Sequence, residues 1–353
     1  MRIAQIAPLY ESVPPKLYGG TEKVVSWLTE ELLGLGHYVA LFSSGDSAAR
    51  DARVAPWPSL RAGPPRRAPS ARRPQPYPAA AYASLLEALR ARADNFDVIH
   101  CHVDGMHLPL LRQLGKPFLA TLHNSLDAPC SSMAVSQLPA AWFVATTVSQ
   151  RARLPELNWA GTVHHGLPAA ALAPRFTAGD YLALLGRREK DQDIATRLAR
   201  ATGMPLRIAS RLDDDGKQAF LGHAAALLFP SEWPGLVVIE AMACGTPVVA
   251  WRRGPVSEFI DDGLTGFIVD TERQAAEAIR RIRALDRHAI RDAFDQRFTA
   301  RRMALDYVSI YRKLAGEKER DRDTARTNKL PPRSAIEIRR ESGDSQQDAA
   351  IAS

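Results

Sequence analysis

Short apolar runs and amphipathic stretches alternate along most of the chain, and this alternation predicts its secondary structure. Apolar runs between turn residues are typical of buried strands, whereas apolar side chains at a spacing of about 3.6 residues indicate helices. The predicted strands are 2–7, 39–43, 98–102, 117–122, 143–148, 180–187, 224–230 and 247–251. The predicted helices are 21–35, 81–93, 236–244, 256–260, 272–284 and 298–314.

Strands that alternate with helices predict a parallel, doubly wound sheet with helices on both faces. The alternation starts twice, at the amino terminus and again near residue 180, and 161–168 reads as the strand that closes the first half. A chain of 353 residues also exceeds the size at which one hydrophobic core usually stops growing. We therefore expect an α/β protein with two Rossmann-like domains, 1–166 and 167–298.

The two domains are followed by a helical segment and a polar tail. Residues 299–316 contain most of the last predicted helix. Residues 317–353 mix charged residues with Thr, Asn, Ser and Gln and contain two adjacent prolines. Such a composition buries little apolar surface, so we expect 317–353 to be disordered.

The net charge of +7 raises the question of nucleic-acid binding, but much of the excess is local. Seven arginines fall within the segment Arg50–Arg73, which is rich in proline and alanine and has no aromatic interleaving for base stacking. No nucleic-acid partner is expected. A solvated surface loop is the simpler interpretation of this segment, and the alternative is peripheral contact with anionic lipid head groups or an acidic acceptor.

Cysteine usage and hydropathy indicate a cytoplasmic protein. Cys101, Cys130 and Cys244 are widely spaced, without the pairing that holds zinc or a disulfide framework. The amino terminus lacks an apolar run suited to a signal peptide, and no stretch reaches the roughly 20 residues of a membrane helix. We expect no metal, and any membrane association would be peripheral, at the inner face.

The junction between strand 224–230 and helix 236–244 carries the most informative chemistry. The amides of Gly235, Leu236 and Val237 have no partners within a helix that starts there, and the helix dipole adds positive charge, so the junction suits a phosphate. Glu232 precedes the helix start, and Glu240 lies about 7 to 8 Å along the helix. The two carboxylates would flank the anion and accept hydrogen bonds from hydroxyl groups on either side.

A sugar joined to a ribose through a diphosphate has this layout, so the junction predicts a nucleotide-sugar site. Two glutamates at this spacing also occur by chance, and Glu232 alone would be a carboxylate that favours the helix dipole. The surrounding residues are more specific. The stretches 229–232 and 235–250 closely resemble the donor-site signature of the family 4 glycosyltransferases.

The resemblance implies the GT-B fold, in which two Rossmann-like domains face each other across a cleft, and it implies that the terminal helix, 299–316, returns to the first domain. It also implies a retaining, metal-independent hexosyltransferase that moves a sugar from a nucleotide-diphosphate donor to a hydroxyl acceptor, which is a glycan, a lipid or a small molecule. By resemblance, Glu232 contacts the donor sugar, Glu240 holds the ribose, and the amides of Leu236 and Val237 receive the diphosphate. The donor is a substrate, so no cofactor is expected.

The first half contributes two further candidates. Gly19 and Gly20, in a Gly-Gly-Thr-Glu stretch after the first strand, match a family loop that approaches the diphosphate and acceptor. The spacing Gly-x-Gly-x-x-Gly is absent after this strand, which argues against a nicotinamide enzyme. His102 ends a strand and matches a histidine that lies beside the transferred sugar in the family.

Four other histidines of the first half are expected to have other roles. His100 lies deeper and is expected to be structural. His123 also ends a strand, and both a structural role and contact with the ligand stay open for it. His164 and His165 are expected to serve the junction between the domains.

Two cations complete the candidate site. Arg187 and Lys190 follow the first strand of the second half and could neutralise the diphosphate as it leaves. The family has two more residues between its arginine and lysine, so the match at Arg187 is the closer one. A solvated basic turn is the alternative interpretation.

The second half departs from the family in length. Only about a dozen residues separate 205–210 from the strand 224–230, where the family inserts another strand and helix. The second domain is therefore expected to be shorter by about one strand-helix unit. This shortening keeps open a degenerate, non-catalytic nucleotide-sugar-binding protein, and a nucleotide-sugar epimerase is the nearest alternative enzyme. A glycosidase would need two carboxyl groups around one bond rather than around a phosphate site.

Overall fold

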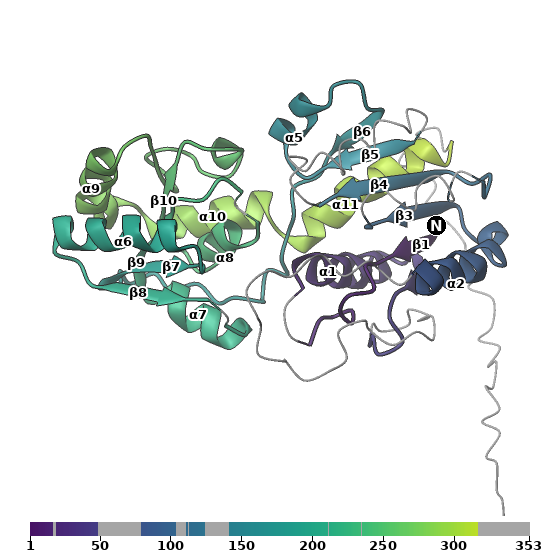
Figure 1. Ribbon diagram of the computed structural model, residues 1–353, viewed down its shortest axis with the longest axis horizontal. Coiled ribbons are helices and arrows are strands. Elements are labelled where there is room, and N and C mark those ends of the chain that lie inside the picture. Colours follow the sequence, from purple (N-terminus) through teal and green to yellow (C-terminus); the bar gives the residue numbers. More distant parts are fainter. Residues whose placement is uncertain are drawn as a thin grey trace, which may run out of the picture. The chain divides into compact units, whose positions relative to one another are not determined.

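The computed structural model describes residues 1–16, 19–48, 79–103, 111, 113–123, 141–210, 212–233 and 235–316 (Figure 1). The expectations for Arg50–Arg73 and for 317–353 lie outside the described residues. Two parallel sheets with flanking helices form the framework, as the alternation of patterns predicted, and Figure 1 shows helices beside the strands of each sheet.

The first sheet has the order β2-β1-β3-β4-β5-β6. Its strands are β1 (Arg2–Ile6), β2 (Tyr38–Phe42), β3 (Val98–Cys101), β4 (Phe118–Leu122), β5 (Trp142–Ala145) and β6 (Trp159–Thr162). All neighbours pair in parallel, and most of their residues are buried. Near-continuous apolar runs are typical of strands whose two faces are both covered, which explains why β1 to β5 were visible in the sequence. The closing strand expected at 161–168 is instead β6, at Trp159–Thr162, whose residues are only half-buried.

The second sheet has five strands in the order β11-β10-β9-β7-β8. They are β7 (Tyr181–Leu185), β8 (Leu206–Ala209), β9 (Ala224–Phe229), β10 (Val248–Trp251) and β11 (Gly266–Val269). β8 is the edge strand beside β7, and β9 lies on the other side of β7. A single helix connects β8 to β9. This agrees with the expected shortening of the second half.

Helices cover these sheets. In the first half they are α1 (Gly20–Gly34), α2 (Ala79–Arg90) and α5 (Val148–Arg153). In the second half they are α6 (Glu189–Thr202), α7 (Asp214–Gly222), α8 (Val237–Ala243), α9 (Glu272–Arg281) and α10 (Arg287–Arg297), and the last helix, α11 (Ala300–Leu314), follows them in sequence. Three 3-10 turns, 93–95, 256–258 and 282–284, complete the regular structure of the described residues.

Several of the predicted helices have different bounds in the structure. The segment 256–260 forms only the 3-10 turn Val256–Glu258, because Gly254, with φ +56°, and Pro255 leave it little length before the turn at 261–266. The helix predicted to start at Leu236 begins at Val237, and Leu236 is its N-cap residue. Gly245, with φ +70°, ends that helix as predicted.

Helix α11 packs against the first sheet although it follows the second one in sequence. Met303, Tyr307 and Tyr311 lie in one buried cluster with residues of β1 and α1, including Ile3 and Leu28. Its start is tied to residue 167 by a parallel bridge, Leu167 to Thr299. The last helix therefore belongs to the core of the first half.

A chain of buried hydrogen bonds joins α11 to the first sheet. His100 Nδ1 lies 2.7 Å from the Tyr311 hydroxyl, and His100 Nε2 lies 2.7 Å from Thr121 Oγ1. Thr121 Oγ1 in turn lies 2.8 Å from the Tyr307 hydroxyl. Both ring nitrogens of His100 are thus satisfied within the protein, and its part is structural, as expected.

We expect Tyr311→Phe to lower the free energy of unfolding by about 1 to 3 kcal/mol, because it leaves Nδ1 of the buried His100 without a partner. Denaturant unfolding checks this value. The matched control is Tyr38→Phe, at a half-buried ring that stacks on Arg2, and it should change the free energy by less than about 0.5 kcal/mol. Equal losses in the two variants would contradict the assigned role of the His100 network.

Candidate functional site

Three loops meet at the carboxyl ends of the second-sheet strands. Ser231, after β9, donates a hydrogen bond of 2.6 Å to Asp191, at the start of α6. Arg253, after β10, donates one of 3.4 Å to the carbonyl of Pro230. The loop after β9 is therefore held by the loops that follow its two neighbours in the sheet, β7 and β10.

The backbone of Gly254 packs directly on the loop after β9. A Cβ at this position would lie 2.1 Å from the carbonyl oxygen of Glu232, and φ is +56°. Only glycine fits such a contact and such a backbone conformation. The position of Glu232 thus depends on a residue outside the donor-site signature.

Helix α8 starts directly behind this loop. Gly235 has φ +51°, and Leu236 and Val237 are half-buried at the helix start. The Glu240 amide already bonds to the carbonyl of Leu236 at 2.8 Å, whereas the amides of the first turn have no partner inside the helix. These amides can donate hydrogen bonds to an anion that lies on the side of the loop.

The two acids of the motif differ in their surroundings. Glu232 is exposed, and no hydrogen bond or ion pair joins its side chain to another described residue. Glu240 is 3% exposed, and its Oε1 lies 2.5 Å from Nζ of Lys217 on α7. The structure therefore holds Glu240 in place with a lysine that no motif in the sequence indicated.

Arg187 and Lys190 occupy the loop after β7 and the first turn of α6. Both are exposed, and within the described part of the chain neither forms a hydrogen bond or ion pair. Gly186, just before them, is held to the edge strand β8 by a bond from its amide to the Ala209 carbonyl at 2.9 Å. The backbone of the loop is anchored while the two cationic side chains are available to a ligand.

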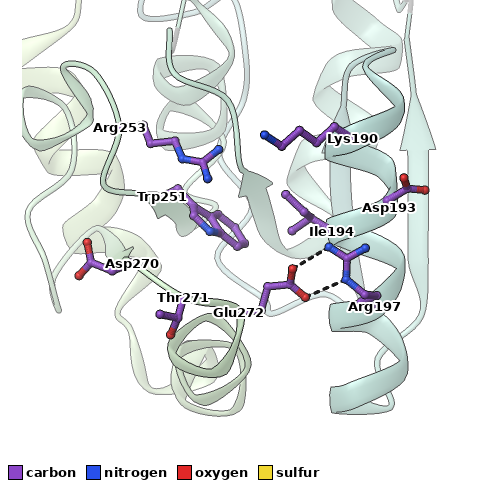
Figure 2. A pocket seen from close by; sticks show the side chains of 9 residues that line it. All are labelled: Lys190, Asp193, Ile194, Arg197, Trp251, Arg253, Asp270, Thr271 and Glu272. Atoms are coloured by element: carbon purple, nitrogen blue, oxygen red, sulfur yellow. Dashed lines mark hydrogen bonds and ion pairs between the residues drawn. The ribbon is translucent and has the colours of Figure 1, made fainter.

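Lys190 also lines a cavity of about 320 Å³ in the second half (Figure 2). Figure 2 shows Lys190 and Arg253 reaching toward each other across it, with Trp251 beside them. On the far side, Arg197 binds Glu272 through two hydrogen bonds of 2.9 and 2.6 Å. The cations at the Lys190 end suit an anionic group, whereas the opposite end is already neutralised.

The two glycine candidates of the first half lie at the start of α1. Gly19 is buried and is the N-cap residue of α1, and Gly20 is exposed. A Cβ at Gly19 would lie 2.5 Å from the carboxylate of Glu22 and 3.1 Å from Pro15, whereas one at Gly20 would meet nothing within 4 Å. Close packing requires glycine at Gly19 only.

His102 follows β3 and is 2% exposed. Its Nδ1 lies 2.9 Å from Nε2 of His123, whose ring stacks on His165 at a centroid distance of 5.1 Å. Burial lowers the pKa of His102 and of His123 well below the usual value, and the neighbouring imidazoles add to this effect. Burial likewise lowers the pKa of His165 to about 4. All three rings are therefore neutral at pH 7.

His164 contacts residues of the second half. Its Nδ1 is 2.8 Å from the carbonyl of Thr146, its Nε2 is 3.8 Å from Glu258, and its ring packs on Phe259. Glu258 in turn accepts hydrogen bonds from the first two amides of α5. His164 thus takes part in contacts between the two halves, whereas His165 joins the histidine stack.

Helix α7 also contacts the first half. Lys23, in the first turn of α1, forms an ion pair with Asp214 at the start of α7. Lys217 on the same helix binds Glu240, so α7 links the glycine loop region to the acid of the second-half site. No hydrogen bond or ion pair within the described residues joins His102, Gly19 or Gly20 directly to Glu232, Glu240, Arg187 or Lys190.

The described ranges contain neither a candidate metal cluster nor a candidate membrane-spanning helix. No group of three or more His, Cys, Asp or Glu side chains there could hold a metal ion. None of the helices there combines the length and the apolar character that spanning a membrane requires.

Models of known families match most of the chain. The model described as Glycosyltransferase Family 4 matches residues 18–189, and the one described as Glycosyl transferases group 1 matches residues 168–285.

Curated relatives match over shorter stretches. A D-inositol 3-phosphate glycosyltransferase from Nocardioides is 32% identical over 130 residues, which is 34% of this chain and 28% of the relative. An N-acetyl-alpha-D-glucosaminyl L-malate synthase from Bacillus anthracis is 33% identical over 93 residues, 24% of each chain. An uncharacterized protein from the cps region of Klebsiella pneumoniae is 32% identical over 29% of this chain and 30% of its own. The chain thus matches less than a third of the length of these relatives.

Solved structures match over nearly the whole chain at low identity. The sucrose-phosphate synthase from Thermosynechococcus elongatus has a TM-score of 0.68 and 20% identity, covering 90% of this chain and 100% of its own. HepE from Anabaena, solved in complex with UDP-glucose, has a TM-score of 0.60 and 14% identity, covering 90% and 98%. These likenesses show the GT-B fold alone. The two family models, which together match residues 18–285, show that the chain belongs to the family 4 glycosyltransferases.

Proposed function

We propose that the protein transfers a hexose from a nucleotide-diphosphate donor to a hydroxyl acceptor. The observation that carries this proposal is the position of Glu240, which is buried beside the open first turn of α8 and held there by Lys217. A buried carboxylate next to unpartnered amides offers a hydroxyl acceptor and an anion site side by side. A ribose diphosphate needs both.

The donor would occupy the carboxyl ends of β7 and β9. Glu240 Oε1 is taken by Lys217, so we assign the ribose hydroxyls to Oε2. The amides at Gly235, Leu236 and Val237 receive the diphosphate, and the exposed Glu232 orients the transferred sugar. The crystal structure of a protein of this fold with UDP-glucose supports a nucleotide sugar as the donor class.

The chemistry we propose is substitution with retention at the anomeric carbon, without a protein nucleophile and without a metal. The acceptor hydroxyl attacks from the face on which the diphosphate leaves, and the enzyme supplies positioning and charge stabilisation. Arg187 and Lys190 neutralise the leaving diphosphate. Both side chains have no partner among the described residues, so no existing ion pair must break first.

The first half would complete the site. His102 contacts the transferred sugar, and Gly19 and Gly20 let the backbone approach the diphosphate and the acceptor. Since the two sets of residues come from different sheets, we propose that the domains are 1–166 and 167–298, that 299–316 returns to the first domain, and that donor binding closes the site. We place the protein in the cytoplasm, where nucleotide sugars are made, with the acceptor a glycan, a lipid or a small molecule.

A non-catalytic nucleotide-sugar-binding protein is the second candidate. The short connection between β8 and β9 and the ion pair on Glu240 favour it, because both change the surroundings of the nucleotide. Turnover separates the candidates: binding without transfer or hydrolysis of any donor would support the second.

Donor binding is tested by melting the protein with UDP-glucose, GDP-mannose and ADP-glucose. One nucleotide class should raise the melting temperature by roughly 3 to 6 °C at a concentration about 100 times the Kd. Glu240→Ala should abolish this rise because the ribose loses its acceptor. The matched control is Glu277→Ala, at an exposed glutamate of α9, which should keep the full rise. A rise that survives in Glu240→Ala would remove the ribose assignment.

The leaving-group role is tested at two adjacent arginines. Arg187→Ala should lower kcat by about 10²- to 10³-fold, because charge builds up on the diphosphate in the transition state. The neighbouring Arg188 is equally exposed, and Arg188→Ala should leave kcat within about twofold. Steady-state kinetics with the donor found by melting gives both values. Similar losses in the two variants would argue for a general effect of surface charge.

The mechanism is tested on the product. Proton NMR of the glycoside should show the same anomeric configuration as in the donor, because no inverting displacement occurs. Turnover should persist after dialysis against EDTA, because Arg187 and Lys190 supply the positive charge. Inversion of configuration, or loss of turnover that Mg²⁺ restores, would overturn the corresponding part of the mechanism.

A further inference from the structure

Lys217 lies at the same edge of the second sheet as the residues of the proposed donor site. It is in the first turn of α7, which follows β8, and β8 is the neighbour of β7. The loops after β7 and β9 carry Arg187 and Glu232, and helix α8 carries Glu240. In open parallel sheets, ligands bind outside the carboxyl ends of the strands. The order of the strands therefore places Lys217 beside the ligand.

The start of α7 is anchored on two sides. Asp213 is its N-cap residue and accepts a hydrogen bond of 2.8 Å from the Gly216 amide. Asp214 forms an ion pair with Lys23 in the first turn of α1. Lys217, close behind these residues in the same turn, therefore extends from a backbone that is already held in place.

The ion pair of Lys217 with Glu240 leaves one oxygen and two N–H groups unused. Lys217 Nζ lies 2.5 Å from Glu240 Oε1, and neither side chain forms another hydrogen bond or ion pair within the described residues. The Lys217 side chain is 14% exposed and the Glu240 side chain 4%. Oε2 is not one of the fully buried unpaired atoms of the described residues, so it faces accessible space. The pair is enclosed but open to a ligand.

The pair presents an acceptor next to a donor. A carboxylate with both oxygens free takes two hydrogen bonds, each donated by a hydroxyl group. In this protein Oε1 already accepts from Lys217, so Oε2 is the open acceptor, and the adjacent ammonium group can only donate. Two neighbouring hydroxyl groups fit both ends if one donates its proton and the other offers a lone pair. The two hydroxyls of a ribose, on neighbouring carbons, have this chemistry.

We propose that Lys217 donates a hydrogen bond to one ribose hydroxyl of the donor while Oε2 of Glu240 accepts from the other. The inference rests on the proposed function and deepens it, because it makes Lys217 a second ribose-contacting residue. It also changes what the ribose must provide. The hydroxyl that faces Glu240 must keep its proton, whereas the hydroxyl that faces Lys217 needs only its oxygen. A lysine that did nothing but neutralise Glu240 would impose no such difference.

The direct test compares two modifications of each ribose hydroxyl. A deoxy nucleotide lacks the whole group, whereas an O-methyl nucleotide keeps the acceptor oxygen and lacks the proton. Calorimetry with the full chain measures the Kd of UDP, GDP and ADP and of their 2′-deoxy, 3′-deoxy, 2′-O-methyl and 3′-O-methyl forms. None of these probes carries a transferable sugar, so only contacts with the nucleotide are measured.

In the unmodified protein, each deoxy form of the nucleotide that binds should bind about 10- to 100-fold more weakly, because it loses a hydrogen bond to a charged group. At one ring position the O-methyl form should recover about tenfold of this loss, because its oxygen still accepts from Lys217. At the other position it should recover none, because Glu240 needs a proton. Equal behaviour at the two positions would overturn the proposal.

Variants of Lys217 identify the residue that tolerates the O-methyl group. Lys217→Arg retains a donor and should retain the tolerance. Lys217→Met frees Oε1 of Glu240, so the second hydroxyl has to donate as well, and the O-methyl form should bind as weakly as the deoxy form. The control is Lys313→Met, at an exposed lysine of α11, which should bind every analogue as the unmodified protein does. Tolerance that survives in Lys217→Met would contradict the proposal.

Failure of this inference differs from failure of the proposed function. Nucleotide binding that depends on Glu240 but does not distinguish O-methyl from deoxy forms would remove Lys217 from the site and keep the donor site. A tolerated O-methyl group without turnover of any nucleotide sugar would keep the Lys217 contact and overturn the transferase. A protein that binds no nucleotide would overturn both. If Lys217→Met does not fold, the analogues with the unmodified protein still decide.

Discussion

The parallel pairing of β7 with β9 is the constraint on which the second-half site depends. These strands are neighbours in the sheet, yet the chain leaves β7 toward β8 on one side and β9 toward β10 on the other. At such a switch point the following loops diverge and leave room above the strand ends. Ser231 and Asp191 bridge the two loops, so Arg187 and Glu232 are anchored to a common base. Glu240 reaches the same place from α8.

The strands and the motif could be predicted from the sequence because their signals are local. β9 and β10 are uninterrupted apolar runs, and Gly245 ends α8 through its own backbone conformation. Helix α6 was not predicted, because its buried apolar residues are only Ile194, Ala195 and Leu198 and most of their neighbours are polar or charged. A periodic signal of that strength does not stand out from a polar loop.

The partners of the site residues could not be predicted in the same way. Lys217 and Glu240 are 23 residues apart on different helices, and only the packing of α7 beside α8 brings them together. His102 and His123 were each visible as strand-end histidines, but their hydrogen bond depends on the pairing of β3 with β4. Patterns in sequence indicate which side chains reach an edge of a sheet, and tertiary structure decides which of them meet.

The neutrality of the histidine stack has a consequence for how a substrate enters. Three imidazoles without charge offer a diphosphate no electrostatic attraction, whereas Arg187, Lys190 and Arg253 provide it on the second sheet. A long substrate with one anionic and one uncharged end thus meets two unlike surfaces. Under the proposed function, a donor that approaches in the reversed orientation would therefore be disfavoured at the encounter itself.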